Sequence, residues 1–188
     1  NYIIAGCKNN EHKWQKTLYE QYYGFALKVA FRYIYKYEKA VDVVNDGFVK
    51  VFRNFIHFNA ADGNNTEKIL LGWIKRIIVN TAIDELRKQN NVAETGEMPE
   101  GVWQQPDMAQ LADEKLVYKD LILQLKKMPP SYRTVFNMHV IDGYSHQEIA
   151  TYMGISIGTS KSSLAKAKAF LQKLLNKGFS EVEYATSK

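Results

Sequence analysis

The sequence predicts an all-α protein: two small helical domains joined by a flexible acidic linker, with a helix-turn-helix in the second domain. Three observations lead to this fold class. Apolar residues recur every three or four positions over most of the 188 residues. No strand-like alternation of apolar and polar residues persists anywhere in the sequence. A stretch rich in Gly, Pro and acidic residues interrupts the helical pattern near the middle of the chain.

The first predicted domain, residues 1–90, contains three helical stretches at 14–37, 39–58 and 69–89. The first stretch is rich in Tyr and Phe and has no Pro in its interior. Gly, Asn and Asp gather in the intervening segment 59–68, which predicts a loop. This domain is therefore expected to be a small helical bundle.

The predicted linker covers residues 91–113. Helix breakers interrupt it at Gly96, Pro99, Gly101 and Pro106. From residue 91 to 114 the chain has acids and neither Lys nor Arg: Glu94, Glu97, Glu100, Asp107, Asp113 and Glu114. The second domain is expected at 114–178, followed by a tail at 179–188.

The second domain is predicted to contain a helix-turn-helix. After helical stretches at 115–128 and 131–142, Ser145 and Glu148 have the spacing of a capping box that begins a short helix. Gly154 permits the left-handed backbone of a sharp turn, and Ser156 suits the cap of the next helix. A short helix, a tight turn and a second capped helix form this motif.

The last helix of this motif has two different faces. At 100° per residue, its buried stripe is Leu164, Ala167, Leu171 and Leu174. The opposite side has small residues, hydroxyls and lysines: Gly158, Thr159, Lys161, Ser162, Ala165, Lys166 and Ala169. Small side chains let a helix enter the DNA major groove, where hydroxyl and ammonium groups meet base edges and phosphates. The alternative is a solvated lysine-rich face on an ordinary helical hairpin.

Composition narrows the possible functions. A formal net charge of +5 fits a polyanionic partner. The single Cys7 excludes an intramolecular disulfide, which indicates a reducing, cytoplasmic setting. No apolar run approaches the ~20 residues of a membrane span, so no membrane insertion is expected. The chain opens at Asn1 without Met or a signal peptide, in what looks like mid-domain sequence, so we expect its natural start to lie upstream.

No cofactor or metal site is predicted. His139 and His146 lie seven residues apart, but Gly143 interrupts the helix between them and no carboxylate or Cys completes a ligand set. We interpret both as surface or core histidines.

Two blocks of sequence resemble the sigma factors of bacterial RNA polymerase. The block "LKKMPPSYRTVFNMHVIDGYSHQEIATYMGISIGTSKSSLAKAKAFL" resembles the fourth region of that family. Upstream, "AVDVVNDGFVKVFRNFIHF" and "GWIKRIIVNTAIDELRKQ" resemble the second region. In having only these two regions, the chain resembles the extracytoplasmic-function (ECF) group of sigma factors. The chain departs from the family at Ser160, where an apolar residue is usual. It also departs at three positions where arginines are usual: Ser163, Lys166 and Lys168.

The resemblance assigns roles to surface residues. It implies that the outer side of the second helix docks on core RNA polymerase: Asp42, Asn45, Asp46, Val49 and Arg53. It implies minus-ten DNA contacts in the third helix and the loop before it: Asn59, Asn64, Asn65, Trp73, Arg76, Asn80 and Arg87. An aromatic, an amide and guanidinium groups on one face suit a melted strand, although Trp73 could equally be a core residue. Minus-thirty-five contacts are implied for Arg133, Ser145, Gly158, Thr159, Lys161, Ser162, Ala165 and Lys166.

The expected function is therefore that of an ECF sigma factor, a non-enzymatic protein of the cytoplasm. Its implied partners are core RNA polymerase, promoter DNA and an anti-sigma factor, with no small-molecule substrate. One alternative is a two-domain helix-turn-helix repressor or activator that acts without being a polymerase subunit. Another is an enzyme built around Asp42, Asp46 and His57, which the lack of supporting His or Cys residues disfavours.

Overall fold

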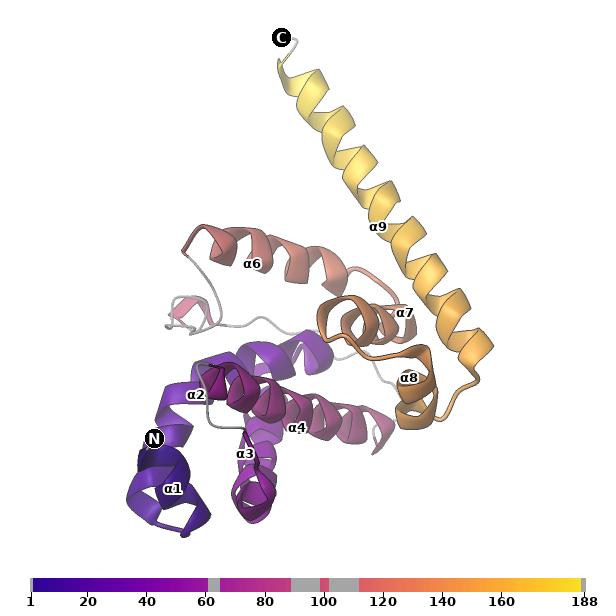
Figure 1. Ribbon diagram of the computed structural model, residues 1–188. Coiled ribbons are helices and arrows are strands. Elements are labelled where there is room, and N and C mark those ends of the chain that lie inside the picture. Colours follow the sequence, from indigo (N-terminus) through magenta and orange to yellow (C-terminus); the bar gives the residue numbers. More distant parts are fainter. Residues whose placement is uncertain (1, 61–64, 89–98, 102–111, 187–188) are drawn as a thin grey trace. The chain divides into compact units, whose positions relative to one another are not determined.

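The computed structural model describes residues 2–60, 65–88, 99–101 and 112–186 (Figure 1). These residues fold into helices, turns and loops without a strand, which confirms the predicted all-α class. The chain divides into two compact units, residues 1–111 and 112–188. In the described part of the chain, no helix has the length and apolar character needed to cross a membrane.

The first unit is a helical bundle in which α2, α3 and α4 contact one another pairwise and α1 packs on α2. Its elements are α1 (Tyr2–Lys8), α2 (His12–Ile34), α3 (Tyr37–Asn54), the 3₁₀ turn η1 (Phe55–His57) and α4 (Thr66–Lys88). Apolar and aromatic side chains from the three long helices fill the core, among them Leu18, Tyr33, Phe48, Ile74 and Ile78. Gly47 marks the close approach of α3 to α4, because a Cβ there would meet the side chain of Ile78.

The junction between α2 and α3 is sharper than the sequence predicts. Helical patterning continues to residue 37, but α2 ends at Ile34. Tyr35 follows in the left-handed region at φ 51°, where its backbone N–H donates to the carbonyl of Phe31. Tyr35 and the extended Lys36 turn the chain within two residues, and Tyr37 begins α3. The short helix α1, before the first predicted stretch, was not predicted.

The second unit contains α6 (Ala112–Lys126), α7 (Pro130–Phe136), the π-helical turn η2 (Asn137–Ile141), α8 (His146–Met153) and α9 (Ile157–Thr186). α9 contacts α6, α7 and α8. Ile122, Leu125, Met138, Ile149 and Ala167 are among the buried apolar side chains that hold these helices together. α9 continues through most of residues 179–188, where the sequence suggests a separate tail.

The helix-turn-helix forms with the predicted caps. The backbone N–H of Glu148 donates to Ser145 Oγ at 3.2 Å, and that of Ser145 donates to Glu148 Oε2 at 2.9 Å. Gly154 ends α8 with φ at +65°. The Thr159 N–H donates to Ser156 Oγ at 3.0 Å at the start of α9. These bonds satisfy backbone groups that the helix ends would leave without partners.

Candidate functional site

One candidate surface is the outer side of α3. Asp42, Asn45, Asp46, Val49 and Arg53 are all exposed, and Tyr19 of α2 donates its hydroxyl hydrogen to Asn45 Oδ1 at 2.9 Å. Val49 is 46% exposed, a large value for an aliphatic side chain in a helical bundle. The face therefore combines acidic groups with apolar area that the first unit does not cover.

Ile56 extends this α3 surface beyond what was predicted. It lies in η1 and is 64% exposed. The spacing of Val49, Arg53 and Ile56, four and then three residues, already indicates one helical face. The sequence therefore contains a signal for Ile56, one turn beyond Arg53 on the same face.

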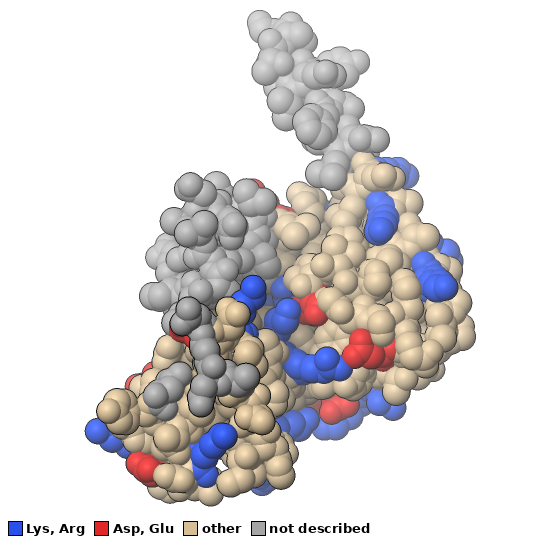
Figure 2. Space-filling view, in the orientation of Figure 1, with Lys and Arg blue, Asp and Glu red and all other residues tan. Residues whose placement is uncertain are grey.

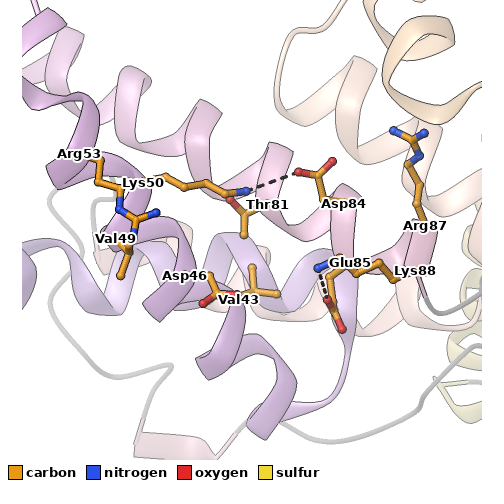
Figure 3. A pocket seen from close by; sticks show the side chains of 10 residues that line it. All are labelled: Val43, Asp46, Val49, Lys50, Arg53, Thr81, Asp84, Glu85, Arg87 and Lys88. Carbon is orange, nitrogen blue, oxygen red and sulfur yellow. Dashed lines mark hydrogen bonds and ion pairs between the residues drawn. The ribbon is translucent and has the colours of Figure 1, made fainter.

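A groove of about 560 Å³ runs between α3 and α4 of the first unit (Figure 3). Lys50 Nζ lies 3.5 Å from Asp84 Oδ2 across it, and Lys88 Nζ lies 3.7 Å from Glu85 Oε2. The groove brings together residues assigned to two different partners. It is lined by Val43, Asp46, Val49, Lys50, Arg53, Thr81, Asp84, Glu85, Arg87 and Lys88.

The predicted minus-ten surface is only partly exposed. Arg76 and Arg87 are exposed on α4, and Asn80 is half-buried. Trp73 is also half-buried, with its ring centroid 5.5 Å from that of Phe55 and 5.1 Å from that of Phe58. Trp73 thus belongs in part to an aromatic cluster with Phe55 and Phe58. In the loop itself Asn59 and Asn65 are exposed, while Asn64 lies outside the described residues.

The α9 face is exposed as predicted. Gly158, Thr159, Lys161, Ser162, Ala165 and Lys166 are all accessible, while Leu164 and Ala167 are buried. Two hydroxyls form hydrogen bonds with neighbouring residues. Thr159 Oγ1 lies 2.9 Å from Ser156 Oγ, and Ser162 Oγ donates to the Thr159 carbonyl at 3.1 Å. Figure 2 shows Lys and Arg atoms spaced along the described part of α9, at the right of the view.

Two residues proposed for this face have structural partners. Ser145 is exposed, but its hydroxyl is occupied in the capping box with Glu148. Arg133 is only 5% exposed, and its Nη1 donates to the carbonyls of Lys126 at 3.1 Å and Met128 at 3.5 Å. The guanidinium thus stabilises the junction of α6 with α7. Arg133 was predicted to be an exposed DNA contact, but its side chain does not lie on the exposed surface.

His139 and His146 lie in contact, but not as a metal pair. Their rings stack with centroids 4.3 Å apart and planes 14° from parallel. A metal ion lies in the plane of each imidazole that binds it, so two stacked rings cannot share one ion. Among the described residues, no group of three His, Cys, Asp or Glu is close enough to form a metal site.

Comparison with known proteins agrees with this architecture. Residues 18–92 match the family Sigma-70 region 2, and residues 118–171 match Sigma-70, region 4. The ECF RNA polymerase sigma factor SigE of Mycolicibacterium smegmatis is 25% identical over 158 residues, which cover 82% of this chain and 58% of SigE. The RNA polymerase sigma-H factor of Pseudomonas aeruginosa is 26% identical over 156 residues, 77% of each chain. This chain thus spans less than two thirds of the SigE length.

A solved structure shares the fold. It is the sigma factor RpoE in complex with the anti-sigma factor NepR from Bartonella quintana, with a TM-score of 0.51 and 21% identity over 86% of this chain and 96% of that one. The two helical units and the helix-turn-helix define a class of DNA-binding transcription proteins. Within that class, the two matched regions in this order place the chain in the sigma-70 family, in its ECF group.

Proposed function

We propose that this protein binds core RNA polymerase and directs it to promoters at the start of transcription. The observation that carries the proposal is the presence of both regions, 2 and 4, in one chain. The first unit supplies the polymerase contact and the minus-ten contact, and the second supplies the minus-thirty-five contact. The protein contributes sequence recognition and performs no chemistry, so it needs neither cofactor nor metal. It acts in the cytoplasm, where RNA polymerase transcribes.

The polymerase contact uses the α3 surface: Asp42, Asn45, Asp46, Val49, Arg53 and Ile56. Exposed Val49 and Ile56 supply apolar area of the kind that forms the centre of protein interfaces. Asp42 and Asp46 lie one turn apart on the same face, an arrangement that a basic partner surface would stabilise. The same surface is available to an anti-sigma factor, which would keep polymerase away by occupying it.

The DNA contacts divide between the two units. In the first unit, exposed Arg76 and Arg87 neutralise phosphates, and Asn80 faces a melted strand together with the accessible edge of Trp73. Asn59 and Asn65 hold a flipped base in the loop that also contains Asn64. In the second unit the exposed α9 face enters the major groove of the minus-thirty-five element.

Asp46→Lys tests the polymerase contact. The side chain is exposed, so the fold should tolerate the change while affinity for core RNA polymerase falls at least several-fold in a competition assay. Asp120→Lys makes the same charge change on an exposed residue of α6 and should leave that affinity unchanged. Equal affinities of the two variants would remove α3 from the interface.

Run-off transcription tests the function as a whole. Core RNA polymerase with this protein should initiate at discrete sites on genomic DNA fragments, and core polymerase alone should not. A repressor or activator that acts without joining polymerase would bind duplex DNA yet fail to co-purify with core enzyme. That result would favour the alternative function.

A further inference from the structure

A polar cluster joins the two helices of the helix-turn-helix. Ser160 of α9 is 0% exposed, and its Oγ lies 2.9 Å from Nδ1 of His146, the first residue of α8. The position of Ser160 on the buried side of α9 calls for an apolar residue, yet the chain places a hydroxyl there and pairs it with an imidazole. A buried hydroxyl needs such a partner, so His146 and Ser160 form a unit.

His139 completes the cluster from η2. Its ring stacks on that of His146, and its Nδ1 lies 2.8 Å from the carbonyl oxygen of Tyr144. A carbonyl only accepts, so His139 Nδ1 carries the hydrogen of this bond. A serine hydroxyl both donates and accepts, so the His146–Ser160 contact persists whether or not His146 is protonated. The cluster can therefore gain a proton without breaking its hydrogen bonds.

The charges around His146 oppose protonation. Partial burial lowers the pKa of His146 from its ordinary value of 6.5, and His139, Lys161 and Lys168 lower this pKa further. The nearest acid on the same helix, Glu148, is bonded to Ser145 through Oε2. On the η2 side, Asp142 is the residue that follows the turn. In the free protein His146 is therefore kept neutral first by its partial burial and then by the neighbouring cationic side chains.

We propose that His146, stacked on His139, is a proton-linked contact for the DNA backbone: it takes up one proton as phosphate oxygens approach, so DNA affinity rises as pH falls. The proposal rests on the DNA-binding role proposed for α9. Stacked imidazoles repel each other when both are charged, which is why His139 lowers the pKa of His146.

The position of the pair favours phosphate over base edges. His146 opens α8, and the first helix of a helix-turn-helix crosses the DNA backbone with its amino end available to phosphate. Lys161, which acts on His146, lies on the exposed α9 face. Phosphates that neutralise Lys161 and Lys168 remove the repulsion that disfavours a charged His146. Binding and protonation must then strengthen each other by equal amounts.

The first test measures affinity against pH. The full chain is titrated with a fluorescent mixed-sequence DNA duplex at low ionic strength, from pH 8 to pH 6. Affinity should rise by up to about tenfold per pH unit at the steepest point, the limit for one linked proton. His146→Gln retains an amide for Ser160 but cannot take up a proton, and its affinity should be nearly constant. His12→Gln, an exposed histidine of the first unit, should retain the wild-type profile.

The second test uses the wild-type protein and so does not depend on the folding of a variant. The imidazole Cε1–H resonance of His146 is followed by NMR against pH, with and without the duplex, and its pKa should rise when DNA is bound. An unchanged or lower pKa overturns the proposal, as does a pH profile that His146→Gln shares with the wild type. These outcomes leave DNA binding itself intact. Failure to bind DNA at any pH, alone or with core polymerase, would instead refute the DNA-binding role and this proposal together.

Discussion

Lys166 Nζ lies 5.6 Å from the centroid of the Tyr132 ring, so a lysine on the exposed face of α9 rests against an aromatic side chain of α7. Such contacts contribute about 0.5–1 kcal/mol at exposed sites. Lysine is a flexible point charge that reads base edges less selectively than arginine. The ring of Tyr132 restricts its orientation, which makes a defined base contact possible at a position where this family usually carries arginine.

Lys166→Ala should therefore reduce sequence preference and not merely affinity. We expect a loss of roughly 1–3 kcal/mol on the preferred minus-thirty-five sequence and a flattened preference at one or two base pairs. Tyr132→Leu should produce a smaller loss at the same base pairs, because it frees the lysine without removing it. Binding of the reconstituted holoenzyme to single-base promoter variants measures both effects.

Lys173→Ala is the matched control on α9. Lys173 is exposed further along the helix, where we expect α9 to have left the major groove. Its removal should weaken binding to all sequences alike and reduce the salt slope by about one unit. A uniform loss for Lys166→Ala as well would make Lys166 a phosphate contact and shift the base-reading surface elsewhere on α9.

Much of the second unit follows from local sequence rules. The capping box at Ser145 and Glu148 and the left-handed Gly154 need only a few neighbouring residues, so they could be predicted and are confirmed. Helical angles also place Ser160 on the buried side of α9, where the structure has it. Its partner His146 was not predictable, because the crossing of α8 and α9 decides which side chain meets Ser160.

Arg133 shows the complementary limit. The motif that resembles the sigma family suggests an exposed DNA contact, and nothing local contradicts it. Burial of the guanidinium depends on how Pro129 and Pro130 turn the chain between α6 and α7, which brings the carbonyls of Lys126 and Met128 to Arg133 Nη1. The groove between α3 and α4 was missed for a similar reason, since its lining comes from two helices whose packing no single periodic pattern describes.

Arg133→Ala should destabilise the second unit. Two carbonyl oxygens lose a charged donor, and unmet buried acceptors of this kind cost roughly 1–3 kcal/mol. Amide hydrogen exchange of Val135 and Phe136 measures the effect within that unit. Lys127→Ala removes an exposed cation from the same junction and should change little. If Arg133→Ala leaves exchange unchanged but weakens DNA binding, Arg133 turns outward in the complex and acts there.

Gly47 and Gly72 form a second matched pair, in the first unit. Gly47→Ala places a methyl group against Ile78, which is itself fully buried, and overpacking of this kind costs roughly 1–3 kcal/mol. Gly72 is exposed within α4 and has open space around it, so Gly72→Ala should stabilise the helix by about 0.5–1 kcal/mol. Urea unfolding followed by tryptophan fluorescence reports on this unit, because Trp14 and Trp73 lie there. Stabilisation by both substitutions would show that α3 and α4 are more loosely packed than the structure has them.

The stability of the second unit should depend on pH through His146. Its pKa in the folded protein is lowered from the ordinary value of 6.5 by partial burial and by His139, Lys161 and Lys168. Folding therefore favours the neutral ring, and the unfolded chain binds more protons. The free energy of unfolding is then highest above pH 6.5, falls as pH drops through that value, and becomes constant below the folded-state pKa. Amide exchange of Ile149 and Ala150 measures this effect. Protection from exchange, expressed relative to an unfolded reference at each pH, should be lower at pH 5.5 than at pH 7.5.

His146→Gln should remove most of this difference, and His12→Gln should not. The same loss of protection in wild type and both variants would assign the effect to other titrating groups.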